Sequence, residues 1–131
     1  MSIENLKKRS LEIRKEILNT CFLCGEPAHI GGALSMVEIL TVLYFKVLNL
    51  NLKNPEDRFI LSKGHGFLGL LSTLYIKKII LKKILNSFQQ NGSEMIAHPI
   101  MNPDLGIETS NGSLGQGLSF GVGLSIANKL K

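Results

Sequence analysis

The sequence has no hydrophobic run long enough to cross a bilayer, which takes about 20 uninterrupted apolar residues. Lysines such as Lys46 and Lys53 break up the apolar stretches of this chain of 131 residues. The amino-terminal residues carry charge, and no apolar core of a secretory signal follows them. We therefore expect a cytoplasmic protein that does not bind membranes.

Cysteine is scarce, with only Cys21 and Cys24 in a Cys-x-x-Cys pair and His29 close behind. A structural zinc site has four ligands, and a second pair at suitable spacing is missing. A redox pair would stand at the start of a helix after a strand, whereas these cysteines end a helical pattern. We interpret them as two small buried hydrophobic side chains.

Clustered positive charge is also missing, although the net charge is +5. The lysines are scattered, aromatic residues make up only 6% of the chain, and no helix-turn-helix, zinc-finger or RNA-recognition signature is present. These absences argue against a nucleic-acid partner. Phosphorylated ligands account for the positive potential equally well. The hydrophobic fraction of 44% supports one compact core.

Helical patterns cover most of the chain. Apolar residues at helical spacing predict a first helix over about residues 2–23, ended by Gly25 and Pro27. Ser35-Met-Val-Glu38 has the spacing of a capping box, which predicts the start of a helix that runs to about Leu48. Further helices are expected over about residues 67–76, 82–90 and 114–131.

The last of these helices carries small residues at steps of four. Gly117, Gly121 and Ser125 share one face, which predicts that another helix packs closely there. Gly115 and Gly117 followed by Gly121 miss the spacing of a dinucleotide-binding loop by one residue, so we discount nicotinamide or flavin binding.

One segment has the character of a strand. Arg58–Ser62 is short, apolar and followed by glycine, which predicts a buried strand of parallel type. The turn at residues 63–66 leaves its carboxyl end, where ligands bind in open α/β sheets. Residues 93–113, with Pro99 and Pro103, are expected to form a long irregular loop of functional type. The expected fold class is α/β, a parallel sheet with flanking helices, and the residues at hand form a mostly helical part with few strands.

A glycine-rich loop and three histidines point to a binding site. Residues 106–117 are dense in glycine and hydroxyl residues and run into a helix, so their backbone N–H groups suit an anionic cofactor. Such turns are as often only structural. His65 is flanked by glycines, His29 stands two residues before Gly31, and His98 precedes Pro99; in such settings an imidazole can point into a cleft and titrate near neutrality. A single such histidine is more often a surface or core residue, but three beside one glycine loop indicate a site.

Taken in order, these motifs resemble the amino-terminal, diphosphate-binding region of transketolases, and most of all the separate amino-terminal subunit of split transketolases. The motifs are His29-Ile-Gly-Gly-Ala-Leu-Ser-Met-Val-Glu-Ile-Leu, Arg58-Phe-Ile-Leu-Ser-Lys-Gly-His-Gly, His98-Pro, and Gly106-Ile-Glu-Thr-Ser-Asn-Gly-Ser-Leu-Gly-Gln-Gly. The resemblance runs from about Ile13 to the last residue. It implies that residues 1–131 are a single partial domain, the start of a thiamine-diphosphate-binding fold.

The resemblance also implies an activity and a role for each matched position. The activity is two-carbon ketol transfer between phosphorylated sugars, as in the pentose phosphate pathway, by an oligomer that includes a carboxy-terminal transketolase subunit. His65 matches the histidine that contacts the diphosphate of thiamine diphosphate. His29 and His98 match histidines that line the substrate channel and hydrogen-bond the sugar, and imidazoles suit the proton transfers of all three positions. The loop that holds the cofactor near its pyrimidine ring is matched by Gly112, Ser113 and Leu114.

Two parts of the family pattern are not in this sequence. The family's Mg2+ ligands, a Gly-Asp-Gly stretch and a downstream asparagine, follow the helix that here reaches Lys131, and its cofactor-activating glutamate belongs to another domain. We therefore expect the cofactor to bind these residues weakly and without turnover, because two phosphate charges would be met by one histidine, lysines and backbone donors.

Two alternatives remain open. One is a 1-deoxyxylulose-5-phosphate synthase-like enzyme, which shares the cofactor scaffold and joins pyruvate to glyceraldehyde phosphate. The turn Ser62-Lys-Gly-His65 and the spacing of His98 from the glycine loop resemble transketolase more. The other is a non-catalytic truncated remnant.

Overall fold

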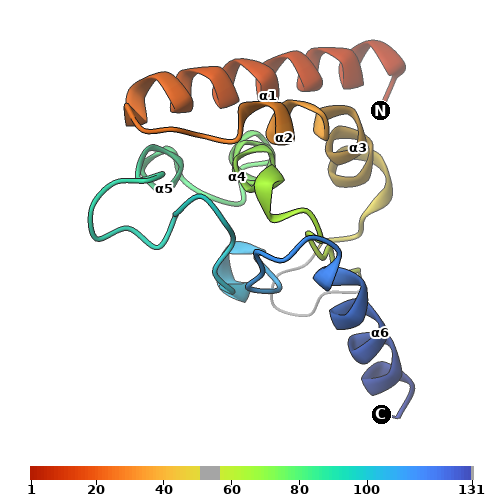
Figure 1. Ribbon diagram of the computed structural model, residues 1–131. Coiled ribbons are helices and arrows are strands. Elements are labelled where there is room, and N and C mark those ends of the chain that lie inside the picture. Colours follow the sequence, from red (N-terminus) through yellow and green to blue (C-terminus); the bar gives the residue numbers. More distant parts are fainter. Residues whose placement is uncertain (51–56, 131) are drawn as a thin grey trace.

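The computed structural model describes residues 1–50 and 57–130. These residues are mostly helical (Figure 1). The α-helices are α1 (Ile3–Cys24), α2 (Ile30–Leu34), α3 (Val37–Val42), α4 (Phe67–Ile76), α5 (Lys82–Asn86) and α6 (Gln116–Lys129). A π-helical turn, η1 (Leu43–Val47), extends α3, and the 3-10 turns are η2 (Gly64–Gly66) and η3 (Pro103–Leu105). Within the described ranges the only β pairing is an isolated antiparallel bridge between Asn102 and Ile107.

The first helix begins and ends where the sequence predicts. The hydroxyl oxygen of Ser2 accepts a hydrogen bond from the backbone N–H of Asn5 at 3.3 Å, which caps the start of α1. Gly25 ends the helix with φ 69°, a left-handed conformation that glycine adopts without steric cost. Ile13 and Ile17 are completely buried, and α1 packs across α2, α3 and α4 (Figure 1).

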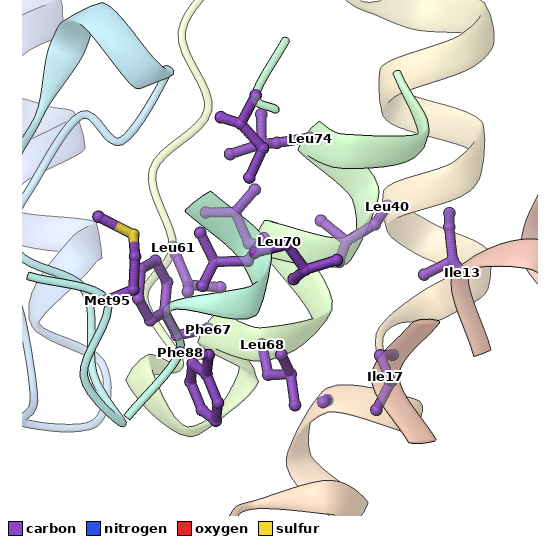
Figure 2. Packing of buried hydrophobic residues seen from close by; sticks show 14 of the residues in the cluster. Ile13, Ile17, Leu40, Leu61, Phe67, Leu68, Leu70, Leu74, Phe88 and Met95 are labelled. Atoms are coloured by element: carbon purple, nitrogen blue, oxygen red, sulfur yellow. The ribbon is translucent and has the colours of Figure 1, made fainter. Parts of the chain in front are cut away.

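Helix α4 is the centre of the core. All its residues from Phe67 to Leu74 are buried, and a helix buried on every side needs neighbours that cover its whole surface. Figure 2 shows α4 side chains such as Leu70 and Leu74 between those of α1 and α3 on one side and Phe88 and Met95 on the other. Because η2 leads directly into α4, this buried helix fixes the turn that carries His65.

The predicted strand at residues 58–62 is wrong for the described structure. A strand needs a ladder of backbone hydrogen bonds to a neighbour, and no described residue pairs with this segment in that way. The backbone carbonyls of this segment instead accept hydrogen bonds from the glycine-rich loop. The carbonyl oxygen of Leu61 accepts from the side-chain amide of Asn111, and that of Ser62 accepts from the N–H of Gly115 at 3.2 Å. A parallel sheet is therefore not formed by the residues described.

The capping box predicted at Ser35 is also wrong. The helical chain already begins at Ile30, and Ser35 follows the last residue of α2. Its hydroxyl donates to the carbonyl of Gly32 at 2.9 Å, while Glu38 forms an ion pair with Arg14 at 2.7 Å. Both side chains that would form the box are thus bonded elsewhere. The predicted end near residue 48 is confirmed, since η1 continues to Val47.

The remaining helices agree with their predicted positions in part. α4 has the predicted bounds, α5 ends at Asn86 instead of near residue 90, and residues 93–113 form the predicted irregular loop apart from η3. On the small-residue face of α6, Gly117 and Gly121 lie against Ser62 and Ile60 of the segment before η2, which is not a helix. A Cβ atom on Gly117 would lie 2.6 Å from Cα of Ser62.

The two cysteines lie at the carboxyl end of α1. Cys21 and Cys24 are free thiols, half-buried against the hydrophobic core, so their interpretation as core side chains is confirmed in part. No described helix combines the length and the apolar character that a membrane span requires.

Candidate functional site

The structure brings the three histidines into one cluster. His29 precedes the first residue of α2, His65 lies in η2, and His98 lies in the loop of residues 93–113. The ring centroids are 4.4 Å apart for His29 and His65, 4.9 Å for His65 and His98, and 5.4 Å for His29 and His98. Three segments far apart in the chain therefore present their imidazoles to one small volume.

A close backbone contact sets the distance between His29 and His65. A Cβ atom on Gly32 would lie 2.7 Å from the carbonyl oxygen of His65, so only glycine lets α2 approach η2 this closely. One turn further, a Cβ atom on Gly69 would lie 2.9 Å from the carbonyl oxygen of Ala33. α2 is thus held against η2 and the start of α4 by glycines on both sides of the contact.

A second contact sets the position of His98. A Cβ atom on Gly64 would lie 2.9 Å from both Cδ2 of His98 and Oδ1 of Asn111. The backbone N–H of Asn111 donates to the carbonyl of Pro99 at 3.3 Å, and its side-chain amide donates to Leu61. Asn111 therefore ties the glycine-rich loop to both neighbours of the site, the segment before η2 and the segment that carries His98.

The electrostatics favour a neutral His98. Partial burial lowers the pKa of His98 below its ordinary value of 6.5, and His65 and His29 lower it further by charge repulsion. A neutral imidazole both accepts and donates a hydrogen bond. His65 contributes an unusual group, because its Nδ1 atom is buried and has no hydrogen-bond partner in the protein. A buried polar atom without a partner is costly, which favours a ligand that forms a hydrogen bond with this nitrogen.

Lys63 adds a positive charge next to the cluster. Its ammonium group donates to the hydroxyl of Ser35 at 2.6 Å, so the side chain bridges from the turn before η2 to the end of α2. Lys63, Ser35 and Asn111 lie within the sequence motifs, but the sequence predicts no site role for their side chains. Their positions depend on tertiary contacts, and the only local signal was their place inside the histidine and glycine motifs.

The three cofactor-loop residues are all exposed, and Gly112 is the one shown to lie near the histidine cluster. An added Cβ atom on Gly112 would be 3.9 Å from Cδ2 of His98, which places this glycine beside the cluster. Ser113 and Leu114 are exposed and lead through Gly115, at φ 88°, into α6. Their expected contact with the cofactor stays a prediction.

A comparison with protein-family models identifies the family to which this site belongs. The model of the transketolase thiamine diphosphate binding domain matches residues 24–131. The chain belongs to the transketolase family. The match includes all three histidines and the whole glycine-rich loop.

Curated relatives agree with the family assignment. The chain is similar to an apulose-4-phosphate transketolase subunit of Phocaeicola vulgatus, with 36% identity over 99% of this chain and 47% of the relative. It is 40% identical to the protein of the same name from Actinobacillus succinogenes, over 98% of this chain and 48% of the relative. A 6-deoxy-6-sulfo-D-fructose transketolase subunit from a Clostridium species is 38% identical over 94% of this chain and 46% of the relative. The chain thus spans about half the length of these relatives.

The donor set fits the cofactor of this domain family but not a magnesium ion. The unpartnered Nδ1 atom of His65, the ammonium of Lys63 and the backbone of the glycine-rich loop are donors of the kind that bind phosphate oxygens. Mg2+ takes carboxylate, carbonyl and water oxygens in near-octahedral geometry. In the part of the chain that is described, the only group of three potential metal ligands is the histidine cluster, and imidazole nitrogens are poor ligands for Mg2+.

Proposed function

We propose that this chain supplies part of the cofactor and sugar site of a transketolase that transfers a two-carbon ketol unit between phosphorylated sugars. The observation that carries the proposal is the convergence of His29, His65 and His98 beside the glycine-rich loop. The match to a thiamine diphosphate binding domain supports the same function. We also propose the wider fold. It is a parallel sheet flanked by helices, and this chain forms a partial domain of it.

We assign the diphosphate end of thiamine diphosphate to His65. Its buried, unpartnered Nδ1 atom can donate a hydrogen bond to a phosphate oxygen in the tautomer that carries the proton there. Lys63 stands one residue before η2, and its ammonium, bonded to the hydroxyl of Ser35, adds a positive charge between η2 and α2. Gly112, Ser113 and Leu114 are assigned to hold the cofactor near its pyrimidine ring. When bound, the cofactor supplies the chemistry that breaks and forms the carbon–carbon bond.

The two other histidines are assigned to the sugar. His29 is exposed and His98 half-buried, so both rings are reachable by a substrate that enters from solvent. Because the pKa of His98 is lowered, its ring is neutral near pH 7 and can accept a proton from a sugar hydroxyl. In this assignment His29 and His98 hold the hydroxyl and carbonyl oxygens of the sugar and move protons at them.

Substrates and partners follow from the relatives. Their names specify a phosphorylated sugar in one case and a sulfonated sugar in another, which supports an anionic ketose as the donor here. Both relatives are named as subunits, which supports an oligomeric enzyme whose other component is the carboxy-terminal transketolase subunit. We also propose a cytoplasmic location and, because the described residues hold no fitting Mg2+ ligands, weak cofactor binding by the chain alone.

Calorimetric titration of the completed enzyme, which contains the family's Mg2+ ligands, with thiamine diphosphate tests the cofactor assignment. His65→Ala should weaken binding about tenfold or more, the cost of losing a hydrogen bond to a charged group. Lys83→Ala is the matched control, because Lys83 is an exposed cation on α5 and not a site residue. Equal affinity of the His65→Ala and control proteins would contradict the assignment of His65.

An activity assay with the completed enzyme, in which the family's Mg2+ ligands and a carboxy-terminal transketolase subunit are both present, tests the reaction. Ketol transfer from a ketose phosphate to an aldose phosphate is the expected activity, and His29→Ala or His98→Ala should lower kcat or raise KM without changing cofactor affinity. Decarboxylation of pyruvate in place of ketose cleavage would favour the synthase alternative. Neither activity in an assembled complex that binds the cofactor would favour the non-catalytic alternative.

A further inference from the structure

The histidine cluster also has the composition of a transition-metal site. One ring nitrogen from each of His29, His65 and His98 lies within 4.8 Å of the other two. Neutral imidazole is the nitrogen ligand that zinc, copper and nickel prefer. Three histidines with a fourth position open to solvent form one of the standard zinc ligand sets.

The distances are close to those that a bound ion requires. Zn–N bonds of about 2.0–2.1 Å in tetrahedral geometry place two ligating nitrogens roughly 3.3 Å apart. At the 4.8 Å limit two nitrogens are about 1.5 Å further apart than in such a complex, so binding an ion requires the side chains to rotate toward one another. The buried Nδ1 atom of His65 has no partner in the protein, so binding an ion there breaks no existing hydrogen bond.

The backbone around the cluster is held in place before any ion binds. The Gly32 contact joins the segments of His29 and His65, and the Gly64 contact joins those of His65 and His98. Because the ligands come from a folded framework, little chain entropy remains to be lost when the ion binds. His29 is exposed, which leaves a path for the ion and room for a fourth ligand from solvent.

We propose that His29, His65 and His98 bind one Zn2+ ion with an open fourth position. This proposal concerns the chain without its cofactor and does not depend on the proposed function. If the transketolase assignment also holds, the ion occupies rings that the cofactor and sugar need, and the two uses exclude each other.

Nuclear magnetic resonance of the imidazole groups gives a direct test, because the chain contains only three histidines. Titration with Zn2+ in the absence of thiamine diphosphate should shift all three imidazole signals together and saturate at one ion per chain. Mg2+ at the same concentrations should leave them unmoved, since it prefers oxygen ligands. If Zn2+ shifts none of the signals, or shifts only one or two, the three-histidine site is wrong.

The competing location for the ion is the pair of thiols on α1. A Cys21→Ser/Cys24→Ser double variant should keep the stoichiometry and affinity for Zn2+. His29→Gln and His98→Gln should each weaken zinc binding about tenfold or more, since loss of even a supporting partner of a metal ligand costs about 10–100-fold. Far-UV circular dichroism identifies variants that have lost the fold. Loss of zinc binding in the folded double cysteine variant would overturn the proposal. Failure of zinc binding leaves the cofactor titration with His65→Ala unaffected, so the two proposals fail independently.

Discussion

The contact between Gly32 and His65 can be tested by adding one methyl group. In Gly32→Ala the new Cβ atom would meet the carbonyl oxygen of His65 at 2.7 Å, about 0.7 Å closer than the start of ordinary van der Waals contact at 3.4 Å. The carbonyl carbon and Cβ of His65 follow at 3.1 and 3.2 Å. Backbone cannot rotate away as a flexible side chain would, so α2 and η2 must separate.

The neighbouring residue provides the control. Gly31 lies in the same turn of α2, and a Cβ atom there would have nothing within 4 Å. Both substitutions gain the helix propensity of alanine, up to about 1 kcal/mol, so this contribution nearly cancels in the comparison. The remaining difference is the cost of overpacking, which is typically about 1–3 kcal/mol.

Urea unfolding followed by far-UV circular dichroism measures the difference. We expect Gly31→Ala to be neutral or slightly more stable than the unmodified chain, and Gly32→Ala to be less stable than Gly31→Ala by about 1–3 kcal/mol. Gly32→Ala should also weaken zinc and cofactor binding, because it moves His65 away from His29. Equal stability of the two variants would refute the argument that this contact sets the spacing of the histidines.

Three further predictions concern the core, the site and one ion pair. Leu74→Ala, at a completely buried position of α4, should lower the free energy of unfolding by about 2–5 kcal/mol, and a urea midpoint close to that of the unmodified chain would contradict the packing in Figure 2. His98 should titrate below pH 6.5 in an NMR pH series. Because the unfolded chain then binds the proton more tightly than the folded chain, the contribution of His98 makes stability fall as the pH drops from about 6.5 through the lowered pKa. The His98→Gln variant should remove this dependence. Glu108→Gln, which breaks the 2.6 Å ion pair with Arg58, should cost at most about 1 kcal/mol and cost less at high salt; a loss that salt does not change would point to packing instead.

Local signals were sufficient for α1 and α4. Gly25 caps the end of α1 and Gly66 of η2 precedes the start of α4, so residues next to each boundary mark it. The predicted strand failed because a strand is defined by its neighbour, and here the partners of residues 61 and 62 are Asn111 and Gly115 from a loop distant in sequence. No local pattern contains that information.

The candidate site divides in the same way. The histidines could be predicted, because a glycine or a proline stands within two residues of each of them in the sequence, and the structure brings the three rings together. The hydrogen bond from Lys63 to Ser35 could not be predicted, because the spacing of Ser35 and Glu38 favours a capping box. The hydroxyl instead bonds the carbonyl of Gly32, and Glu38 bonds Arg14. Competing tertiary partners decided the outcome at both residues.

The three imidazoles belong to segments that are adjacent only in the folded chain. A ligand held by all of them must be released before the protein can unfold globally, so occupancy adds to stability in proportion to the logarithm of free ligand over Kd. The melting temperature of the chain therefore reports how tightly a ligand binds the histidine cluster. A dye-based thermal scan across a panel of metals and sugar phosphates would rank its occupants without any enzymatic assay.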